Sequence, residues 1–458
     1  MNNYDVVIIG SGASGVFMAY EFVKLNKGLK ICMIDRGGPI SERKCPIDGK
    51  KIKSCIHCKI CSIMNGFGGA GGMSDGKYNI TNNFGGDLYT YTGREQAIEL
   101  MRYVDKINLE MGGGDAKLYS TVSSDLKSEA LKYDLHLLDA QVRHLGTDRN
   151  KEILHNIYNY IKNNIDIKFF EEVISVEKNG AKFSVVSNKD TYTCRQVVVA
   201  AGRSGSKWIS EICRNFNIET KSNRVDIGVR VEIPAAVFEH ITSKVYESKI
   251  VYRTKKYRDL VRTFCMNPYG EVVNENTNGI ITVNGHSYAD PALQTDNTNF
   301  ALLVSNHFSE PFSDSNTYGE SIARLSNMLG GGVLVQRFGD LVDGRRTNEH
   351  RFQQCFLTPT LKATPGDLSL VIPKRQLDDI IEMIYALDKI APGMANTDTL
   401  LYGVEVKFYN SKVAVDNNLE TNIEGLYVLG DGSGVTHSLS QASASGVHTA
   451  RVIAEKYE

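Results

Sequence analysis

The amino-acid sequence predicts an α/β protein in which segments from both ends of the chain build one parallel sheet, with a mainly β (α+β) domain inserted between them. Residues 4–36 read as a strand, a glycine turn, a helix and a second strand. Residues 196–205 (QVVVAAGRSG) and 425–434 (GLYVLGDGSG) each read as a buried strand that ends in glycine. We therefore expect a first domain of residues 1–224, completed by residues 396–458, and an inserted substrate domain of residues 225–395.

The opening segment carries the G-x-G-x-x-G pattern of a Rossmann-like dinucleotide site. Gly10 permits the tight turn, Gly12 lets the backbone approach a pyrophosphate, and Gly15 lets the helix pack on the sheet. The free N–H groups at the start of that helix attract phosphate. Asp35 ends the second strand and is placed to accept hydrogen bonds from a ribose hydroxyl.

The C-terminal segment indicates which dinucleotide is bound. Gly430-Asp431 places a carboxylate at the end of a strand, and such an acid suits the ribityl hydroxyls that FAD has and NAD lacks. Together the three segments resemble the FAD-binding fold of the glutathione-reductase-type flavoproteins, and a plain NAD-binding domain is the alternative. The predicted FAD-binding residues are Gly10, Gly12, Ala13, Ser14, Gly15, Asp35, Arg36, Gly69, Ala70, Gly71, Ser74, Asp75, Ala201, Gly202, Gly430, Asp431, Gly432 and Gln441.

Composition places the chain among ordinary globular proteins. A net charge of −1 gives no general drive toward nucleic acid or anionic membranes. No apolar run approaches the roughly 18 residues that a membrane helix needs. The N-terminus MNNYD carries no basic segment, so we expect no signal peptide, no membrane partner and a cytoplasmic location. The oligomeric state is not predicted.

Four of the nine cysteines form a spaced group, Cys45, Cys55, Cys58 and Cys61, inside a cysteine-rich loop of residues 41–62. The C-x2-C-x2-C spacing, with a fourth cysteine followed by proline, is typical of [4Fe–4S] ligands. Four thiolates also suit zinc. A dithiol pair exchanging electrons with the flavin, and unliganded thiols, are the other interpretations.

A glycine-rich segment follows, NGFGGAGGMSDGKYNITN (65–82). Six glycines within residues 65–76 cost backbone entropy and suit a backbone that runs against a flat ligand, which we expect to be FAD. Ser74, Asp75 and Lys77 are the polar side chains that this loop would present. A flexible surface loop is the alternative.

Helical spacing predicts helices over 94–111, 149–163, 318–329 and 376–390, the first two within a helical segment of residues 94–163. Strand-like runs separated by Asn, Gly and Pro fill much of residues 225–395. A final helix is expected from near His437 to about Lys456, with Ser438 and Gln441 at capping-box spacing.

The run ERKCPIDGKKIKSCIHCKICSIMNGFGGAGGMSDGK, with RHLGTD, TFCMNPYGEVV, VNGHSY, QRFGD, TLLYGVEVKF and GDGSG, resembles a family of uncharacterised bacterial FAD-dependent dehydrogenases. The resemblance spans nearly the whole chain. It implies a two-domain flavoprotein oxidoreductase and supplies no substrate.

Five residues are candidates for proton transfer or anion binding. Strand alternation puts Glu405 and Lys407 on one face, and a solvated strand face is the alternative for them. His286 follows a strand, and His437 precedes the last helix, whose dipole would favour reduced flavin. The candidate catalytic residues are Lys77, Glu405, Lys407, His286 and His437.

These features predict an FAD-dependent oxidoreductase that transfers a hydride between flavin N5 and a C–C or C–N double bond of a small organic substrate. A bound iron–sulfur cluster would relay single electrons, with an electron-transfer protein as partner. The basic, tyrosine-containing stretch 244–262 makes a flavin-dependent RNA-modifying enzyme one alternative, with RNA a less favoured partner. A thiol–disulfide reductase is the other.

Overall fold

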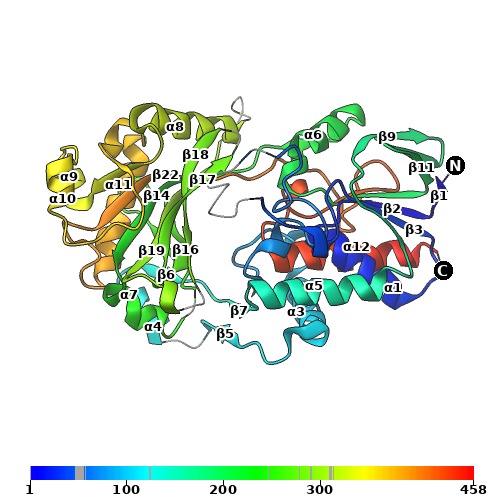
Figure 1. Cartoon of the computed structure of the whole chain (residues 1–458), viewed down its shortest axis with the longest axis horizontal. Helices are drawn as coiled ribbons and strands as arrows, with labels where there is room; N and C mark the ends of the chain where they lie inside the picture. The colour runs from blue at the N-terminus through cyan, green and yellow to red at the C-terminus, as the bar shows by residue number, and fades with distance from the viewer. Residues whose placement is uncertain are drawn as a thin grey trace. The chain divides into compact units, whose positions relative to one another are not determined.

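The computed structural model describes residues 2–46, 56, 58–122, 125–245, 247–277, 279–288, 291–308, 312 and 314–457 (Figure 1). The chain divides into two compact units. Unit 1 comprises Met1–Leu118, Gln141–Lys221 and Asn410–Glu458, and unit 2 comprises Tyr119–Ala140 and Ser222–Tyr409.

Unit 1 is built on a five-stranded parallel sheet in the order β24-β12-β2-β3-β8. Both faces of the sheet are covered, as the continuous apolar sequence of its strands requires. Val6 and Ile8 of β2 face one hydrophobic cluster, whereas Val7 and Ile9 face another. The sheet strands are β2 (Val6–Ile9), β3 (Ile31–Ile34), β8 (Asp166–Lys168), β12 (Gln196–Val199) and β24 (Leu426–Val428).

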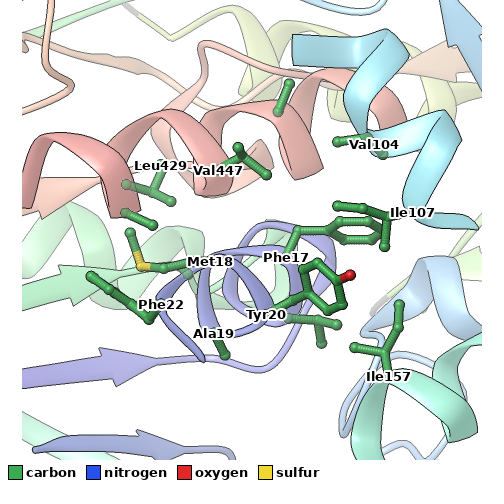
Figure 2. Packing of buried hydrophobic residues seen from close by; sticks show 14 of the residues in the cluster. Phe17, Met18, Ala19, Tyr20, Phe22, Val104, Ile107, Ile157, Leu429 and Val447 are labelled. Carbon is green, nitrogen blue, oxygen red and sulfur yellow. The ribbon is translucent and has the colours of Figure 1, made fainter. Parts of the chain in front are cut away.

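Helices from distant parts of the chain cover the first face. Helix α1 packs against α12, α3 and α5 through side chains that include Phe17, Ile107, Ile157 and Val447 (Figure 2). A Cβ on Gly446 would lie 2.1 Å from the Ser14 carbonyl oxygen, so glycine lets α12 approach α1 closely. The helices are α1 (Ala13–Leu25), α3 (Arg94–Asn108), α5 (Thr147–Ile161) and α12 (Leu439–Glu455).

The second face is covered by α6 and by a small four-stranded sheet in the order β1-β11-β10-β9. Shorter elements complete the unit. These elements are β1 (Asn2–Asn3), η1 (Ile40–Glu42), η2 (Ala70–Met73), β4 (Lys77–Ile80), α2 (Tyr89–Thr92), the π turn η3 (Leu109–Gly113), β7 (Gln141–His144), β9 (Val173–Asn179), β10 (Lys182–Ser187), β11 (Thr191–Cys194), η4 (Arg203–Gly205), α6 (Ser206–Asn215), β13 (Thr220–Lys221), β23 (Lys412–Val413) and η7 (Asp431–Ser433).

Unit 2 contains an eight-stranded sheet in the order β21-β20-β22-β14-β19-β16-β15-β6. Neighbouring strands are antiparallel except β20 and β21. The strands are β6 (Leu135–Leu137), β14 (Val225–Pro234), β15 (Ile250–Arg253), β16 (Leu260–Asn267), β19 (Asn297–Asn306), β20 (Leu334–Arg337), β21 (Thr364–Pro365) and β22 (Leu400–Lys407).

The two faces of this sheet differ in chemistry. Val229 and Val231 of β14 belong to an apolar cluster that also contains residues of helices α7 and α11. The intervening residues of the same strand, Arg230 and Glu232, are fully buried on the opposite, polar face. The remaining elements are α4 (Asp125–Leu131), α7 (Ala235–Thr242), β17 (Glu271–Thr277), β18 (Ile280–His286), η5 (Pro291–Leu293), α8 (Ser315–Gly330), α9 (Phe338–Val342), α10 (Glu349–Gln353), η6 (Leu368–Leu370) and α11 (Lys374–Asp388); β5 (Leu118–Ser120) lies where the chain passes from unit 1 to unit 2.

The α/β class agrees with the sequence prediction, and helices α3, α5, α8 and α11 lie where helical spacing predicts them. The domain boundaries differ from the prediction. The inserted part runs from Ser222 to Tyr409, so β22 belongs to unit 2 rather than to the returning segment 396–458. Residues 119–140 also belong to unit 2, because β6 pairs with β15 at the edge of the large sheet. A strand of three residues within a predicted helical region carries little periodic signal.

Candidate functional site

The glycine turn after β2 has the geometry that each glycine was expected to provide. Gly10 has a φ of +105°, and a Cβ there would lie 2.7 Å from the Ala200 carbonyl oxygen. A Cβ on Gly15 would lie 2.1 Å from the Gly10 carbonyl oxygen. By contrast, a Cβ on Gly12 would meet only the Ala200 oxygen, at 3.9 Å. Gly10 and Gly15 are therefore required by the protein's own packing, whereas a Cβ on Gly12 would make only an ordinary van der Waals contact.

The three predicted nucleotide segments meet at this turn. A Cβ on Gly430 would lie 2.6 Å from Ser14 Oγ, and a Cβ on Gly432 would lie 2.0 Å from the Ala201 carbonyl oxygen. The parallel pairing of β12 with both β2 and β24 brings these ends to the same edge of the sheet. Asp431 follows β24 and is half-buried, with Arg203 Nε 4.0 Å from its carboxylate.

Asp35 joins this turn to the glycine-rich loop. One carboxylate oxygen accepts hydrogen bonds from the N–H and hydroxyl of Ser11, both at 2.8 Å. The other accepts from the N–H groups of Gly37 at 2.7 Å and Gly66 at 3.0 Å. The adjacent Arg36 donates from Nε to Asn65 Oδ1 at 2.8 Å. The structure therefore gives Asp35 a role in holding the loops in addition to the ribose contact predicted for it.

The glycine-rich loop lies against the first turn. Gly68 N–H donates to the Ser11 carbonyl at 2.7 Å, and a Cβ on Gly69 would lie 2.9 Å from the Cα of Gly12. One turn later, a Cβ on Gly71 would lie 2.2 Å from Leu439 Cδ2, at the start of α12. The segment from Gly69 through Ala70 to Gly71 thus connects the N-terminal ends of α1 and α12.

Buried side chains hold this loop in place. The Arg43 guanidinium donates to the carbonyls of Ser62, Ile63 and Phe67 at 2.9, 2.7 and 2.7 Å, and burial lowers the pKa of Arg43 to about 10. Asn150, on α5, donates to the Gly71 carbonyl at 2.9 Å. Sequence reasoning assigned no role to either residue, because their carbonyl partners lie up to 24 residues away for Arg43 and 79 residues away for Asn150. The hydroxyl of Ser74, a predicted FAD contact, donates to the Gly71 carbonyl at 2.7 Å.

The N-terminus of α12 is capped by Ser438, whose hydroxyl accepts from the Gln441 N–H at 3.3 Å. The reciprocal half of the predicted capping box is wrong. The fully buried Gln441 side chain instead donates to the carbonyls of Thr81 and Phe84 and accepts from the Leu88 N–H. These bonds hold residues 81–88 against α12, so the structure shows Gln441 fixing a loop, which the cofactor assignment had not anticipated.

Lys77 lies in a group of three polar side chains within unit 1. The Asp75 carboxylate is 3.3 Å from Lys77 Nζ and 3.3 Å from His144 Nε2. Burial opposes ionisation of Asp75, but the His144 hydrogen bond and the Lys77 charge lower its pKa to about 2. Antiparallel pairing of β4 with β7 places Lys77 opposite His144. His437 lies elsewhere in unit 1, where its N–H donates to the Gly85 carbonyl at 2.9 Å.

The cysteine prediction is tested only in part. Cys55 lies outside the described residues, while Cys45 and Cys61 are half-buried and Cys58 is exposed. Among the described residues, no group of three or more His, Cys, Asp or Glu side chains is arranged to hold a metal.

In unit 2, the candidate Glu405 does not pair with Lys407. Its carboxylate receives both Nη1 hydrogen bonds of the fully buried Arg230, at 2.7 and 3.0 Å. Burial raises the pKa of Glu405 to about 7 despite this cation. Lys407 lies on the same face, as predicted, and burial lowers its pKa to about 8. The candidate His286 is exposed at the end of β18, with its ring centre 4.8 Å from that of Tyr288.

Parts of the basic stretch 244–262 are engaged within unit 2. Tyr252 is buried and donates to Glu382 at 2.9 Å. Lys256 and Tyr257 both donate to Asp378, at 2.8 and 3.1 Å. Tyr246, the third tyrosine of the stretch, lies outside the described residues. These contacts remove two of the tyrosines from the role of freely stacking aromatics.

The residues present in unit 1 fit FAD. The start of α1 receives no side-chain capping hydrogen bond from the described residues, so its N–H groups are available to an anion. A Cβ on Gly12 would meet only one protein atom, and Asp35 and Asp431 follow β3 and β24, which end at the same edge of the parallel sheet. No helix within the described part of the chain has both the length and the hydropathy to cross a membrane.

Comparisons with known proteins connect this architecture to flavin chemistry. Residues 224–408 match the family model described as FAD-dependent protein, C-terminal domain-like. An uncharacterized protein of Clostridium beijerinckii is 26% identical over 474 residues, which covers 99% of this chain and 81% of the relative. The description of this family supports FAD as the cofactor.

Two solved structures align with nearly the whole chain at low similarity. Glycine oxidase from Geobacillus kaustophilus is 10% identical with a TM-score of 0.42, covering 100% of this chain and 96% of that chain. NikD, an amino acid oxidase essential for nikkomycin biosynthesis, is 12% identical with a TM-score of 0.42, covering 100% and 95%. At these TM-scores neither likeness carries an argument about fold or function, and the glutathione-reductase subtype stays a prediction.

Proposed function

We propose that unit 1 holds FAD and that the chain is an oxidoreductase that transfers a hydride between the flavin and a C–C or C–N double bond of an organic substrate bound by unit 2. The observation that carries this proposal is the start of α1, where no described side chain caps the N–H groups and a Cβ on Gly12 would make only one contact, at 3.9 Å. Segments distant in sequence meet at the same turn. The match of unit 2 to an FAD-dependent family supports the same conclusion.

The residues of unit 1 divide between the parts of FAD. The turn from Gly10 to Gly15 and the start of α1 would receive the pyrophosphate. Asp35 would serve the adenosine ribose and Asp431 the ribityl chain. The dipole at the N-terminus of α12 would favour negative charge on the reduced ring.

Bound FAD supplies hydride transfer at N5 and exchange between one- and two-electron steps. The chain's own residues then handle the accompanying proton. Lys77 Nζ and His144 Nε2 each lie 3.3 Å from the Asp75 carboxylate, which would orient Lys77 Nζ. The arrangement fits a general acid more closely than the exposed His286 does.

The cysteine quartet, an electron-transfer partner and a cytoplasmic location stay predictions. Anaerobic purification followed by iron, zinc and sulfide analysis distinguishes the cysteine interpretations. About four irons per chain with broad absorption near roughly 400 nm would establish the cluster. Flavin absorption alone, without iron, would eliminate it.

The Gly12→Ala variant tests the FAD site. The purified wild-type protein should contain FAD, identified by mass spectrometry after release. Because the added methyl meets only one protein atom, at 3.9 Å, the variant should fold with an unchanged apoprotein Tm and lose most of its FAD. Gly332→Ala in unit 2, whose Cβ would meet only Ile281 Cδ1 at 4.0 Å, is the matched control and should retain FAD. Equal FAD content in wild type and Gly12→Ala would contradict the assignment.

Oxidoreductase activity is tested on the same preparation. A reductant should bleach the flavin absorption anaerobically, and an unsaturated substrate should restore it. An FAD-containing protein that no reductant bleaches would be a binding protein instead.

A further inference from the structure

The polar face of the unit 2 sheet carries a second group of charged residues beside the Arg230–Glu405 pair, and the charge of one of them, Lys407, opposes the rise in the pKa of Glu405. Three cations surround one aromatic ring, that of Phe264. The ring centre lies 4.2 Å from Arg262 Cζ, 4.9 Å from Lys407 Nζ and 5.6 Å from Lys249 Nζ. We call these four residues the Phe264 cluster.

Three strands assemble the Phe264 cluster. Arg262 and Phe264 lie on β16, Lys407 ends β22, and Lys249 directly precedes β15. Phe264 is 4% exposed and packs with Ala301 and Leu303 of β19, which fixes the ring on this face. The cations are therefore held by the sheet rather than by mobile loops.

The neighbouring carboxylates do not balance this charge. Glu247 Oε1 lies 2.6 Å from Lys249 Nζ, so this carboxylate forms an ion pair with Lys249. The fully buried Asp226 lies 3.7 Å from both Arg224 and Arg262 and accepts the Tyr409 hydroxyl at 2.6 Å. The two carboxylates thus face four cations: Arg224, Lys249, Arg262 and Lys407.

Two cations of the cluster, Arg262 and Lys407, have hydrogen-bonding or charge capacity that the described residues do not satisfy. Arg262 Nε is buried and has no hydrogen-bond acceptor among the described residues. Lys407 forms no ion pair within the described part of the chain, although Asp226 is its cross-strand partner in the β14–β22 register. Burying a donor or a cation without an acceptor costs free energy, and a bound anion removes that cost.

The cluster also meets the requirement of access. Lys407 is half-buried, and the Arg262 side chain is 12% exposed, so neither is sealed in the core. Burial lowers the pKa of Lys407 to about 8, which leaves it mostly protonated at neutral pH and able to pair with an anion.

We propose that the Phe264 cluster binds an oxyanionic group of the substrate, a carboxylate or a phosphate, through Lys407 and Arg262. A guanidinium and an ammonium that approach one ring from two strands would hold such a group with charge-assisted hydrogen bonds. This assignment rests on the proposed function for its role in catalysis, and it restricts the substrate to organic anions.

Calorimetric titration of the purified full chain with benzoate, inorganic phosphate and the neutral benzamide tests the proposal. At least one of the two anions should bind, and benzamide should bind at least tenfold more weakly than benzoate if benzoate is a ligand. Binding of benzoate alone assigns a carboxylate, and binding of phosphate alone assigns a phosphate.

Substitution locates the binding. Lys407→Met and Arg262→Met should each weaken anion binding at least tenfold, whereas Lys407→Arg should retain it. Lys362→Met, which removes an exposed lysine of unit 2, should bind as wild type does. The far-ultraviolet circular dichroism and Tm of each variant report its folding, and Lys407→Gln replaces the methionine variant if the latter does not fold.

Anion binding that is absent in the wild type, or equal in the wild type and both charge-removing variants, would overturn the proposal. Failure of the proposed function is recognised separately, because it would appear as absence of FAD from the wild-type protein. The Gly12→Ala variant separates the two further, since it should lose FAD and still bind the anion.

Discussion

The candidate site of unit 1 is formed mainly by backbone atoms, whereas that of unit 2 is formed mainly by charged side chains. The Gly12 region of unit 1 is made almost entirely of backbone, with glycines bringing carbonyl and N–H groups together. The polar face of the unit 2 sheet is made of long charged side chains held over a buried strand. In unit 1 the close approach of backbone segments depends on glycines that have no Cβ. In unit 2 the arrangement of the side chains depends on which charges are paired. Substitutions should therefore damage the two units through different physical causes.

The largest effect is expected in unit 2, at the Arg230–Glu405 pair. Glu405→Gln leaves Arg230, fully buried, without its carboxylate and should lower the free energy of unfolding by about 3–5 kcal/mol. Denaturant titration measures this loss. The double variant Arg230→Met with Glu405→Leu should recover most of the stability, because it removes both charges. A double variant no more stable than Glu405→Gln would show that the pair contributes more than charge compensation.

The next effect is expected in unit 1, at a position where backbone leaves no space. Gly15→Ala places a methyl 2.1 Å from the Gly10 carbonyl oxygen and should cost about 1–3 kcal/mol, together with the loss of FAD. Thermal unfolding and FAD content measure the two losses. Gly12→Ala should show only the second loss. Equal Tm values for the two alanine variants would remove the distinction between packing glycines and ligand-facing glycines.

A smaller effect is expected at Gln441 of unit 1, whose side chain holds the backbone of residues 81–88. Gln441→Leu leaves the carbonyls of Thr81 and Phe84 and the N–H of Leu88 without their buried partner, at a cost of about 1–3 kcal/mol. Hydrogen exchange at Leu88 should accelerate. Gln441→Glu keeps the acceptor for Leu88 and should protect that amide better than leucine does. Unchanged exchange in Gln441→Leu would show that the backbone alone holds the loop.

The smallest effect concerns acid stability at Asp75. The pKa of Asp75 is lowered to about 2 from 3.8 because the His144 and Lys77 interactions outweigh burial. Its contribution to stability is present above 3.8 and is lost as pH falls toward 2. Asp75→Asn should therefore lower Tm at pH 6, and the difference from wild type should close as pH approaches 2. A difference that stays constant with pH would assign the loss to packing.

The sequence was informative where the physical requirement is local. Gly10, Gly12 and Gly15 are separated by two and three positions, so the turn that they form appears as a pattern in the chain. Strand alternation likewise placed Glu405 and Lys407 on one face. Partners distant in sequence gave no such signal. Gln441 binds backbone 353 to 360 residues away, and Arg230 binds Glu405 175 residues away.

The apolar face of α3 also depends on a partner distant in sequence. Ala97, Leu100, Met101, Val104 and Ile107 are its buried apolar residues. The partner helix α12 decides which stripe is covered, and it lies more than 300 residues later in the chain. Residues 119–140 joined the wrong domain for a similar reason, since only the pairing of β6 with β15 reveals their place.

The return of the chain to unit 1 after Tyr409 has a consequence for synthesis. Strand β24 and helix α12 follow Tyr409, so the parallel sheet lacks an edge strand and α1 lacks a packing partner until the segment after Tyr409 has been translated. Unit 2 can complete its core first, because all of its residues precede Asn410. During this interval we expect the apolar side of α1 that packs on α12 to be exposed, so unit 1 should show more apolar surface than unit 2 while the chain is being made.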